Sequence, residues 1–179
     1  MCKKLYRIEL SRHAVEYAKK EYSLNFINKT IEEYIDEVNS VDVVLMSHVI
    51  EHLDKPFDNI ESIANKMSKS SVLIFSTYNM DSLIAKVLGK NYQWIMPMHK
   101  YYFTKGVLKN ILGKYNLEIV ETISDTHIIS MKYFFIKINA IVPFLRFLTT
   151  PLMKIKFFNN LNIKINLGDL DIYCVKKTI

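Results

Sequence analysis

Two histidines and a glutamate that follow a short apolar run are the side chains of this sequence best suited to chemistry. The run spans residues 43–46, and His48, Glu51 and His52 come directly after it. In an open α/β sheet, ligands bind beyond the carboxyl ends of the strands, where loops carry polar groups. Imidazole and carboxylate groups that converge there can bind a divalent ion. In the alternative interpretation, His48 packs beneath a pocket, Glu51 and His52 fix the loop, and no metal binds.

The elements that must position these residues are predicted by the hydrophobic pattern. Residues 43–46 form a continuous apolar run, which is typical of a strand covered by helices on both faces. Apolar residues recur at helical spacing from Ile60 to Met67, and residues 72–75 indicate a second buried strand. Ser11, Asp81 and Thr104 are expected to cap further helices, the first of them running to Tyr22. Further strands are predicted at residues 5–10, 24–27, 118–124 and 171–176. Alternating strands and helices indicate a mostly parallel sheet.

Length and composition fit a single domain. Half of the 179 residues are apolar, which is enough to bury a proper core. The net charge of +6 comes from lysines in many segments, without the concentrated basic face that nucleic-acid binding favours, so no nucleic-acid partner is expected. Cys2 and Cys174 form neither a metal pair nor a disulfide framework, and residues 1–11 lack the apolar core of a signal peptide. Both observations favour a cytoplasmic protein.

Residues 131–158 depart from the alternating pattern. They are apolar and aromatic, but they are interrupted by basic residues and by Pro143 and Pro151. A transmembrane helix needs about 20 uninterrupted apolar residues, and Arg146 falls in the middle of this segment. We favour a helical insertion that packs over a substrate pocket, because apolar residues at helical spacing usually face a core. A basic, aromatic stretch that lies in a membrane interface is the alternative.

Several motifs stand in the order of a known family. They are HVIEHL at residues 48–53, Pro56, STYN at residues 76–79 with Ser82, and PMH at residues 97–99 followed by Phe103 and Thr104. In these motifs the sequence resembles the class I S-adenosylmethionine-dependent methyltransferases, in the type 11/type 23 subgroup that includes the ubiquinone-biosynthesis O-methyltransferases. The resemblance extends from about residue 5 to residue 120 and returns at the turn of Gly168 and Asp169. It implies a Rossmann-like, doubly wound α/β fold whose mostly parallel sheet has an antiparallel last strand.

The resemblance also implies that residues 1–179 are one methyltransferase domain, truncated at its N-terminus. All four glycines lie at residue 89 or later, so the glycine-rich loop of the family is not found and its first strand is missing. The start of the chain resembles the second strand of the family, with Arg7 where glycine is common. In the family the missing strand lies in the middle of the sheet. We therefore expect unpaired strand edges, which are costly when buried, or a strand supplied by a partner chain.

The function that the resemblance implies is methyl transfer from S-adenosyl-L-methionine to a hydroxyl oxygen of a small-molecule or glycan acceptor. Two alternatives stay open: an inactive, truncated remnant of a methyltransferase, and a membrane-peripheral interaction module built on residues 131–158. For the cofactor, the resemblance implies a carboxylate at Glu9 that accepts hydrogen bonds from both ribose hydroxyls. The full set of implied cofactor contacts is Glu9, Leu10, Thr30, Ile31, Ser47 and His48.

His99 is the general base that the resemblance implies, because an imidazole titrates near the working pH and can take the hydroxyl proton. Glu51 and His52 are the other implied catalytic residues. Related methyltransferases hold a metal at an E-x-x-E-H motif, and here His48 stands in place of the first glutamate. A metal at His48, Glu51 and His52, with His99 expected near the remaining open position, would therefore be a softer ion such as Zn²⁺ or Fe²⁺ rather than Mg²⁺. The expected pocket wall is Tyr92, Trp94, Tyr101 and Tyr102, and His127 is interpreted as incidental.

Overall fold

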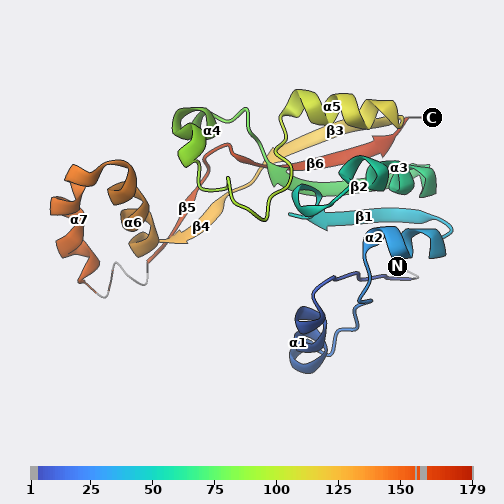
Figure 1. Cartoon of the computed structure of the whole chain (residues 1–179), viewed down its shortest axis with the longest axis horizontal. Helices are drawn as coiled ribbons and strands as arrows, with labels where there is room; N and C mark the ends of the chain where they lie inside the picture. Colours follow the sequence, from blue (N-terminus) through green and yellow to red (C-terminus); the bar gives the residue numbers. More distant parts are fainter. Residues whose placement is uncertain (1–3, 156, 158–160, 179) are drawn as a thin grey trace.

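A computed structural model describes residues 4–155, 157 and 161–178, and Figure 1 shows how its elements are arranged. The body of the molecule contains a four-stranded sheet in the order β1-β2-β6-β3. The strands are β1 (Val41–Ser47), β2 (Met67–Tyr78), β6 (Leu170–Lys177) and β3 (Leu117–Ser124). β1 and β2 run parallel, whereas β6 runs antiparallel to both β2 and β3. This arrangement confirms the expected α/β class with one antiparallel strand, the last in the sequence.

One face of the sheet builds the core. The pairing register places Val44 beside Leu73 and Met46 beside Phe75, and Leu73 and Phe75 are fully buried. Two amphipathic helices cover this face, α3 (Pro56–Lys66) and α5 (Lys105–Lys114). Their buried apolar residues include Ile60, Ile63, Leu108 and Leu112. Because these apolar stripes lock the helices onto the sheet, the carboxyl ends of β1 and β2 are held side by side.

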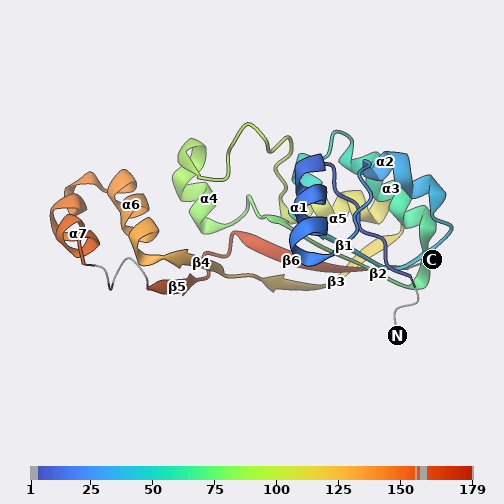
Figure 2. The same ribbon diagram turned by 90° about the horizontal axis from the view of Figure 1, so that it is seen from below.

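The opposite face of the sheet is open. Figure 2 shows the helices of the body on one side of the sheet. Val43 and Leu45, which alternate with the inward residues of β1, are 64% and 73% exposed. The expectation that helices cover both faces of this strand is therefore wrong, since an apolar run does not reveal which neighbours a strand has. β1 is also an edge strand, because among the described strands it pairs with β2 alone.

The segment before β1 is less regular than its pattern predicts. α1 (Arg12–Tyr22) begins as expected at Ser11, whose hydroxyl accepts a hydrogen bond from the Ala14 amide. The strands predicted at residues 5–10 and 24–27 are reduced to one parallel bridge between Ile8 and Ile27. A lone pair of short segments gains little from pairing, because each lacks a further strand to extend the ladder. The chain then passes through α2 (Ile31–Tyr34) and η1 (Ile35–Glu37) into β1.

Three short helical elements follow the first two strands of the sheet. They are η2 (Ile50–His52) after β1, and α4 (Leu83–Leu88) with η3 (Gly89–Asn91) after β2. The cap of α4 is Ser82, whose hydroxyl accepts from the Ala85 amide, and not Asp81 as expected. The predicted cap of α5 at Thr104 is confirmed, since its hydroxyl accepts from the Val107 amide.

A projecting arm separates β3 from β6 in the sequence. We define the arm as residues 127–165. Its elements are β4 (His127–Ser130), α6 (Met131–Ile141), η4 (Pro143–Leu145), α7 (Arg146–Met153) and β5 (Asn162–Ile165). β4 and β5 pair antiparallel and carry the helices away from the sheet (Figure 1). The helices thus lie beyond the end of the sheet and do not cover the loops after β1 and β2, contrary to the interpretation we favour from the sequence. Among the described residues, no helix combines the length and the apolar character needed to cross a membrane.

Candidate active site

The candidate site begins where β1 ends. His48 follows the strand with a φ of 52°, in the left-handed region that residues other than glycine seldom adopt. Its amide lies 3.2 Å from both the carbonyl oxygen and the Oγ of Ser76 in β2. These contacts hold the bend against the neighbouring strand. The bend turns the chain back so that η2 brings Glu51 beneath the end of β2.

Glu51 is a buried carboxylate with a partner on each oxygen. The residue is 1% exposed. One oxygen lies 3.2 Å from Nδ1 of His48, and the other accepts from the Thr77 hydroxyl at 3.1 Å. Burial raises the pKa of the Glu51 carboxyl, but the hydrogen bonds from His48, the backbone and Thr77 outweigh burial and leave the pKa below its usual value. Glu51 therefore brings a fixed negative charge to the site at neutral pH.

Two histidines lie beside this carboxylate, each with a ring nitrogen within 4.8 Å of it. Nδ1 of His52 lies 2.9 Å from the Met98 carbonyl, and Nδ1 of His99 lies 2.8 Å from the Trp94 carbonyl. A carbonyl can only accept, so in each ring Nδ1 carries the proton and Nε2 presents the lone pair. The two rings meet edge to face with centroids 4.8 Å apart. Both imidazoles are thus oriented by a backbone contact, as is usual for histidines that bind metals or protons.

Glu51, His52 and His99 form a group of potential metal ligands. One ligand atom of each lies within 4.8 Å of the other two, and no second such group occurs in the part of the chain that the structure describes. The sequence predicts His48 as the third member, whereas the structure brings His99 to Glu51 and His52 and places His48 against the Glu51 carboxylate. His99 arrives there because the next amide, that of Lys100, donates to the Glu51 carbonyl at 2.8 Å.

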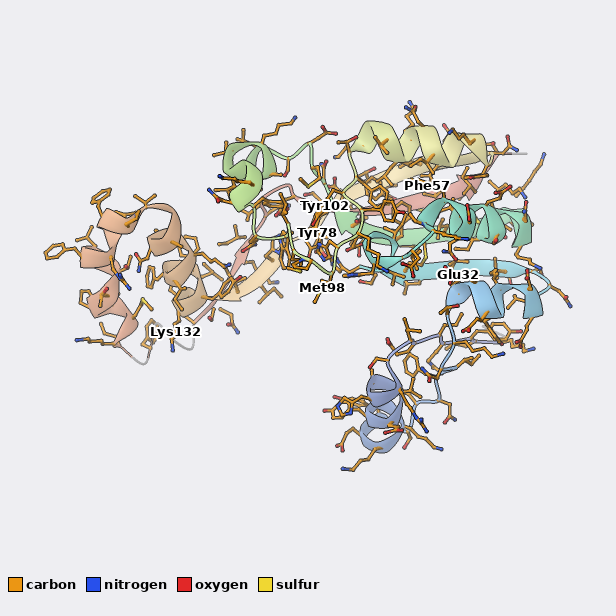
Figure 3. All side chains as sticks on the ribbon, in the orientation of Figure 1. Glu32, Phe57, Tyr78, Met98, Tyr102 and Lys132 are labelled. Atoms are coloured by element: carbon orange, nitrogen blue, oxygen red, sulfur yellow. The ribbon has the colours of Figure 1, made fainter. Side chains whose placement is uncertain are left out.

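Aromatic rings extend the site beyond His99. Tyr78, at the end of β2, stacks on Trp94 with centroids 4.5 Å apart and lies 5.5 Å from the His99 ring. Figure 3 shows Tyr78, Met98 and Tyr102 together at the end of the sheet that faces the arm. Burial, reinforced by the charges of Glu51 and Asp169, raises the pKa of Tyr78, so the phenol stays protonated.

Trp94 carries an unpaired donor within this aromatic layer. Its indole Nε1 is buried and has no hydrogen-bond partner among the described residues. Native proteins pair nearly all of their buried polar groups. The Trp94 indole thus keeps a donor that none of the described residues uses, and the membership of Trp94 in a pocket wall stays a prediction.

A buried network around Asp169 is the feature that the sequence did not predict. Asp169 is 1% exposed; it accepts from the Tyr92 hydroxyl at 2.7 Å and lies 2.8 Å from Nε2 of His127. Burial, together with the bond to Asp169, raises the pKa of Tyr92. Tyr92 is 2% exposed and so is not an open pocket wall, and His127, which stacks on Trp94 at 6.0 Å, is not incidental. The one signal for this network was the turn at Gly168, whose φ of 65° sets Asp169 before β6.

The residues expected to contact the cofactor lie in two groups. In the first, Glu9 and Leu10 are held by the side-chain amide of Asn28, which donates to their carbonyls at 3.0 and 2.9 Å. One oxygen of the Glu9 carboxylate accepts from the Ser11 amide at 2.7 Å. The described contacts leave the second oxygen without a partner. The Glu9 side chain therefore combines a local cap with capacity for a further donor.

The second group surrounds the start of α2 and the end of β1. Thr30 caps α2 in a capping box with Glu33. The Thr30 hydroxyl accepts from the Glu33 amide, and the Thr30 amide donates to the Glu33 carboxylate. Ile31 is partly buried and packs against the core. Ser47 is paired with Ser76 through hydroxyls 3.3 Å apart, next to His48. Of this group, Ser47 and His48 lie next to Glu51, whereas Thr30 and Ile31 serve the helix and the core.

Comparisons with known proteins agree with this architecture. The sequence profile of a family described as a methyltransferase domain matches residues 2–122. No curated protein gives a significant match. The fold is similar to a putative S-adenosylmethionine-dependent methyltransferase from Listeria monocytogenes, with 16% identity, a TM-score of 0.61, and coverage of 99% of this chain and 82% of that chain. It is also similar to a SAM-dependent methyltransferase from Archaeoglobus fulgidus, with 19% identity, a TM-score of 0.57, and coverage of 95% and 74%.

A third similar structure is magnesium protoporphyrin IX methyltransferase from Synechocystis, crystallised with SAH. It is 15% identical over 97% of this chain and 63% of that chain, with a TM-score of 0.51. At these identities the likeness concerns the fold.

Proposed function

The chain belongs to the methyltransferase domain family, and on this basis we propose that it transfers a methyl group from S-adenosylmethionine to a hydroxyl oxygen of a small-molecule or glycan acceptor. The observation that carries the acceptor side is the meeting of Glu51, His52 and His99 beside the unpaired Trp94 N–H. A hydroxyl must lose its proton as it attacks the methyl carbon. A site with free imidazole lone pairs and a fixed carboxylate suits such an acceptor.

The residues expected to bind the methyl donor are of chemical types that suit S-adenosylmethionine. Glu9 offers a carboxylate oxygen that the described contacts leave free, and a carboxylate is an acceptor-only group suited to ribose hydroxyls. Leu10, next to it, is 69% exposed and offers apolar surface for the adenine. When bound, the sulfonium supplies the electrophilic methyl group. Glu9 and Leu10 would hold the nucleoside, while Ser47 and His48 stand nearest to the acceptor residues.

In the first version of the site, His99 takes the acceptor proton. The Trp94 carbonyl holds the proton of His99 on Nδ1, which leaves the Nε2 lone pair to accept the hydroxyl proton as the new oxygen–carbon bond forms. Glu51 would then stabilise the imidazolium that results, because its charge is fixed nearby. The Trp94 N–H would donate to the acceptor and keep its oxygen beside His99.

In the second version, Glu51, His52 and His99 hold a divalent ion. Two imidazoles and one carboxylate favour a softer ion such as Zn²⁺ or Fe²⁺ over Mg²⁺. A bound ion would lower the pKa of the acceptor hydroxyl. The Nε2 lone pair of His99 cannot bind an ion and a proton at the same time, so the two versions predict different results.

Isothermal calorimetry with S-adenosylmethionine tests the donor side. We expect binding by the wild-type chain and an affinity about tenfold lower for Glu9→Gln, because an amide replaces a charge-assisted acceptor. Glu61→Gln, at an exposed carboxylate of α3, is the matched control and should bind like wild type. Failure of the folded wild-type chain to bind the donor would contradict the proposed methyl transfer.

A Zn²⁺ titration separates the two versions of the acceptor side. If the ion binds, His52→Ala and His99→Ala each lower the affinity by about tenfold or more, since each removes one ligand. His13→Ala, at an exposed histidine of α1, should leave the affinity unchanged. Equal affinities in all four proteins would contradict the metal version and leave His99 as the base.

A further inference from the structure

The arm carries the whole net charge of the chain. Six of the 24 lysines and arginines lie in residues 127–165, whereas all 18 acidic residues lie outside them. The rest of the chain is therefore neutral. Residues 82–117 also contain six lysines and no acidic residue, but three of these lysines pair with carboxylates: Lys86 with Asp81, Lys100 with Asp54 and Lys105 with Asp171. Among the described residues of the arm, no lysine or arginine forms such an ion pair. Such an uncompensated cluster attracts an anionic surface within a Debye length.

The arm also exposes large apolar side chains next to these charges. Phe144, Phe147 and Leu148 are 76%, 85% and 57% exposed. Among the described side chains of α6 and α7, that of Thr149 alone is buried. Exposed apolar surface rimmed by basic residues is the composition of an amphipathic element that lies in a membrane interface. Lys132 illustrates the distance from the catalytic end, since Figure 3 places it on the arm, well apart from Tyr78.

A hollow between the two helices combines both kinds of group. Its volume is about 540 Å³, and its lining includes the apolar Ile136 and Met153 together with Arg146 and Lys154. The helices are joined by a hydrogen bond of 2.7 Å from the Thr149 hydroxyl to the Asn139 side chain. Apolar walls with two cations suit an amphiphile that has an anionic head.

We propose that the arm docks on the surface of a bilayer that contains anionic phospholipids. Phe144 and Phe147 enter the interface, while Arg146 and Lys154 contact the lipid phosphates. Because the described helices are too short and too charged to span, the association is peripheral and reversible. The arm starts at His127, which stacks on Trp94, so docking would tether the body and its candidate active site to the bilayer surface through the arm. The docking itself does not depend on methyl transfer.

Vesicle flotation tests the proposal directly. We expect the chain to float with vesicles of equal parts phosphatidylglycerol and phosphatidylcholine, to be released by high salt, and not to float with phosphatidylcholine alone. The double variants Arg146→Glu/Lys154→Glu and Phe144→Ser/Phe147→Ser should each lower binding by about tenfold or more. Lys69→Glu/Lys109→Glu, which reverses two exposed lysines of β2 and α5, is the charge-matched control and should bind like wild type.

Three flotation results would overturn the proposal: no binding of the wild-type chain to the anionic vesicles, equal loss in the control, or full binding by both arm variants. Circular dichroism is the control that checks whether each variant is folded. All four altered arm positions are exposed to solvent, so the substitutions leave the core intact.

Fluorescence quenching provides a measurement that does not depend on affinity. Trp94 is the single tryptophan of the chain, and it lies on the body. In Phe147→Trp, brominated acyl chains should quench the added emission, whereas the wild-type emission should change little. Equal quenching of the two proteins would contradict insertion by the arm.

A second copy of the chain is the other occupant that these apolar residues could have. Sedimentation velocity without lipid distinguishes it. A monomer is expected for the wild-type chain. A dimer that Phe144→Ser/Phe147→Ser dissociates, with no vesicle binding by the wild-type chain, would overturn the lipid proposal and assign the arm to self-association.

Discussion

At the scale of the residue, buried carboxylates organise the end of the molecule that holds the candidate site. Glu51 and Asp169 are each 1% exposed, and each accepts hydrogen bonds from a hydroxyl and an imidazole. A buried charge is tolerated only when its oxygens are paired. Each of these carboxylates therefore dictates where its partner rings stand. For Asp169 the partners come from distant segments, so it ties the loop after α4 to the root of the arm.

The Tyr92 hydroxyl should contribute measurably to stability. Tyr92→Phe removes a 2.7 Å bond to Asp169, and we expect the free energy of unfolding to fall by about 1–3 kcal/mol, because a buried acceptor loses a donor. Tyr173→Phe is the matched comparison. Its hydroxyl lies 3.3 Å from Asp171, which also has Lys105 at 3.1 Å, so the loss should be smaller. Urea unfolding measures both. A larger loss in Tyr173→Phe would contradict the assignment.

The carboxyl of Glu32 should make stability depend on acid pH. Burial raises its pKa, but the hydrogen bonds from Asn59, the backbone and Thr30 outweigh burial and lower it. A carboxyl whose pKa is lower in the folded chain stabilises fully above its unfolded pKa and loses that contribution as the pH falls through its folded pKa. Between pH 6 and about pH 3, wild type should therefore lose more stability than Glu32→Gln.

The expected difference for Glu32 is on the order of 0.5 kcal/mol, because the residue is exposed and solvent screens it. Urea unfolding at several pH values measures it. Glu61→Gln, at an exposed carboxylate that forms no hydrogen bond or ion pair with the described residues, should follow wild type at every pH. Parallel curves for wild type and Glu32→Gln would contradict the role of the Asn59 contact, whose length is 2.7 Å.

At the scale of the element, helices with similar N-caps differ in how much they contribute to the stability of the whole fold. α5 begins at Thr104 and buries Leu108 and Leu112 against the sheet. α6 begins at Ser130, whose hydroxyl accepts from the Tyr133 amide at 3.2 Å, but none of its described side chains is buried. A cap stabilises the whole fold only if its helix unfolds together with the core. The two caps should therefore give different results on removal.

Removing the caps tests this difference. Thr104→Ala should lower the global free energy of unfolding by about 1 kcal/mol, the usual contribution of an N-cap. Ser130→Ala should leave the global value unchanged and instead raise the rate of amide exchange within α6. Urea unfolding and hydrogen exchange measure the two effects. Equal global losses would mean that the arm unfolds together with the body.

At the scale of the whole molecule, the chain divides into a body with a core and an arm whose described residues form none. The core cluster is drawn from the sheet, α3, α5 and the loops between them. The arm is joined to the body by its two strands, by the contacts of His127, and by the Tyr133 hydroxyl of α6, which donates to the Gln93 side chain at 3.3 Å (Figure 1). An element with little buried apolar surface opens locally, at a lower free energy than the core. Membrane docking would use this independence, since the arm helices can adapt to a surface without opening the core of the body.

Hydrogen exchange should resolve the two parts in the wild-type chain. Amides of β2 and β6, which lie inside the sheet, should show the highest protection. Amides of α6 and α7 should exchange on the order of 100-fold faster or more, because they open without global unfolding. Mass spectrometry of peptides from each element measures the rates. Comparable protection in the arm and in β2 would contradict this division.

Much of the fold could be read from local patterns. The apolar runs predict β1, β2, β3 and β6, the helical spacing predicts α3, and Ser11 and Thr104 predict two helix starts. These features follow from backbone geometry and from side chains within a few residues, so a pattern is sufficient. The motifs around Glu51 and His52 predict the family. A local pattern predicts the length of a strand less well, because that length depends on pairing with other strands. The single bridge between Ile8 and Ile27, in place of two predicted strands, is an example.

The composition of the site was decided by contacts between distant segments. The pairing of the Lys100 amide with the Glu51 carbonyl brings His99 to Glu51 and His52, and no local pattern contains that contact. The same holds for Asp169, whose partners Tyr92 and His127 lie far away along the chain. Local propensity sets which elements form, because it depends on neighbouring residues. Which side chains meet depends on how loops dock on the finished sheet, and this is a property of the tertiary structure alone.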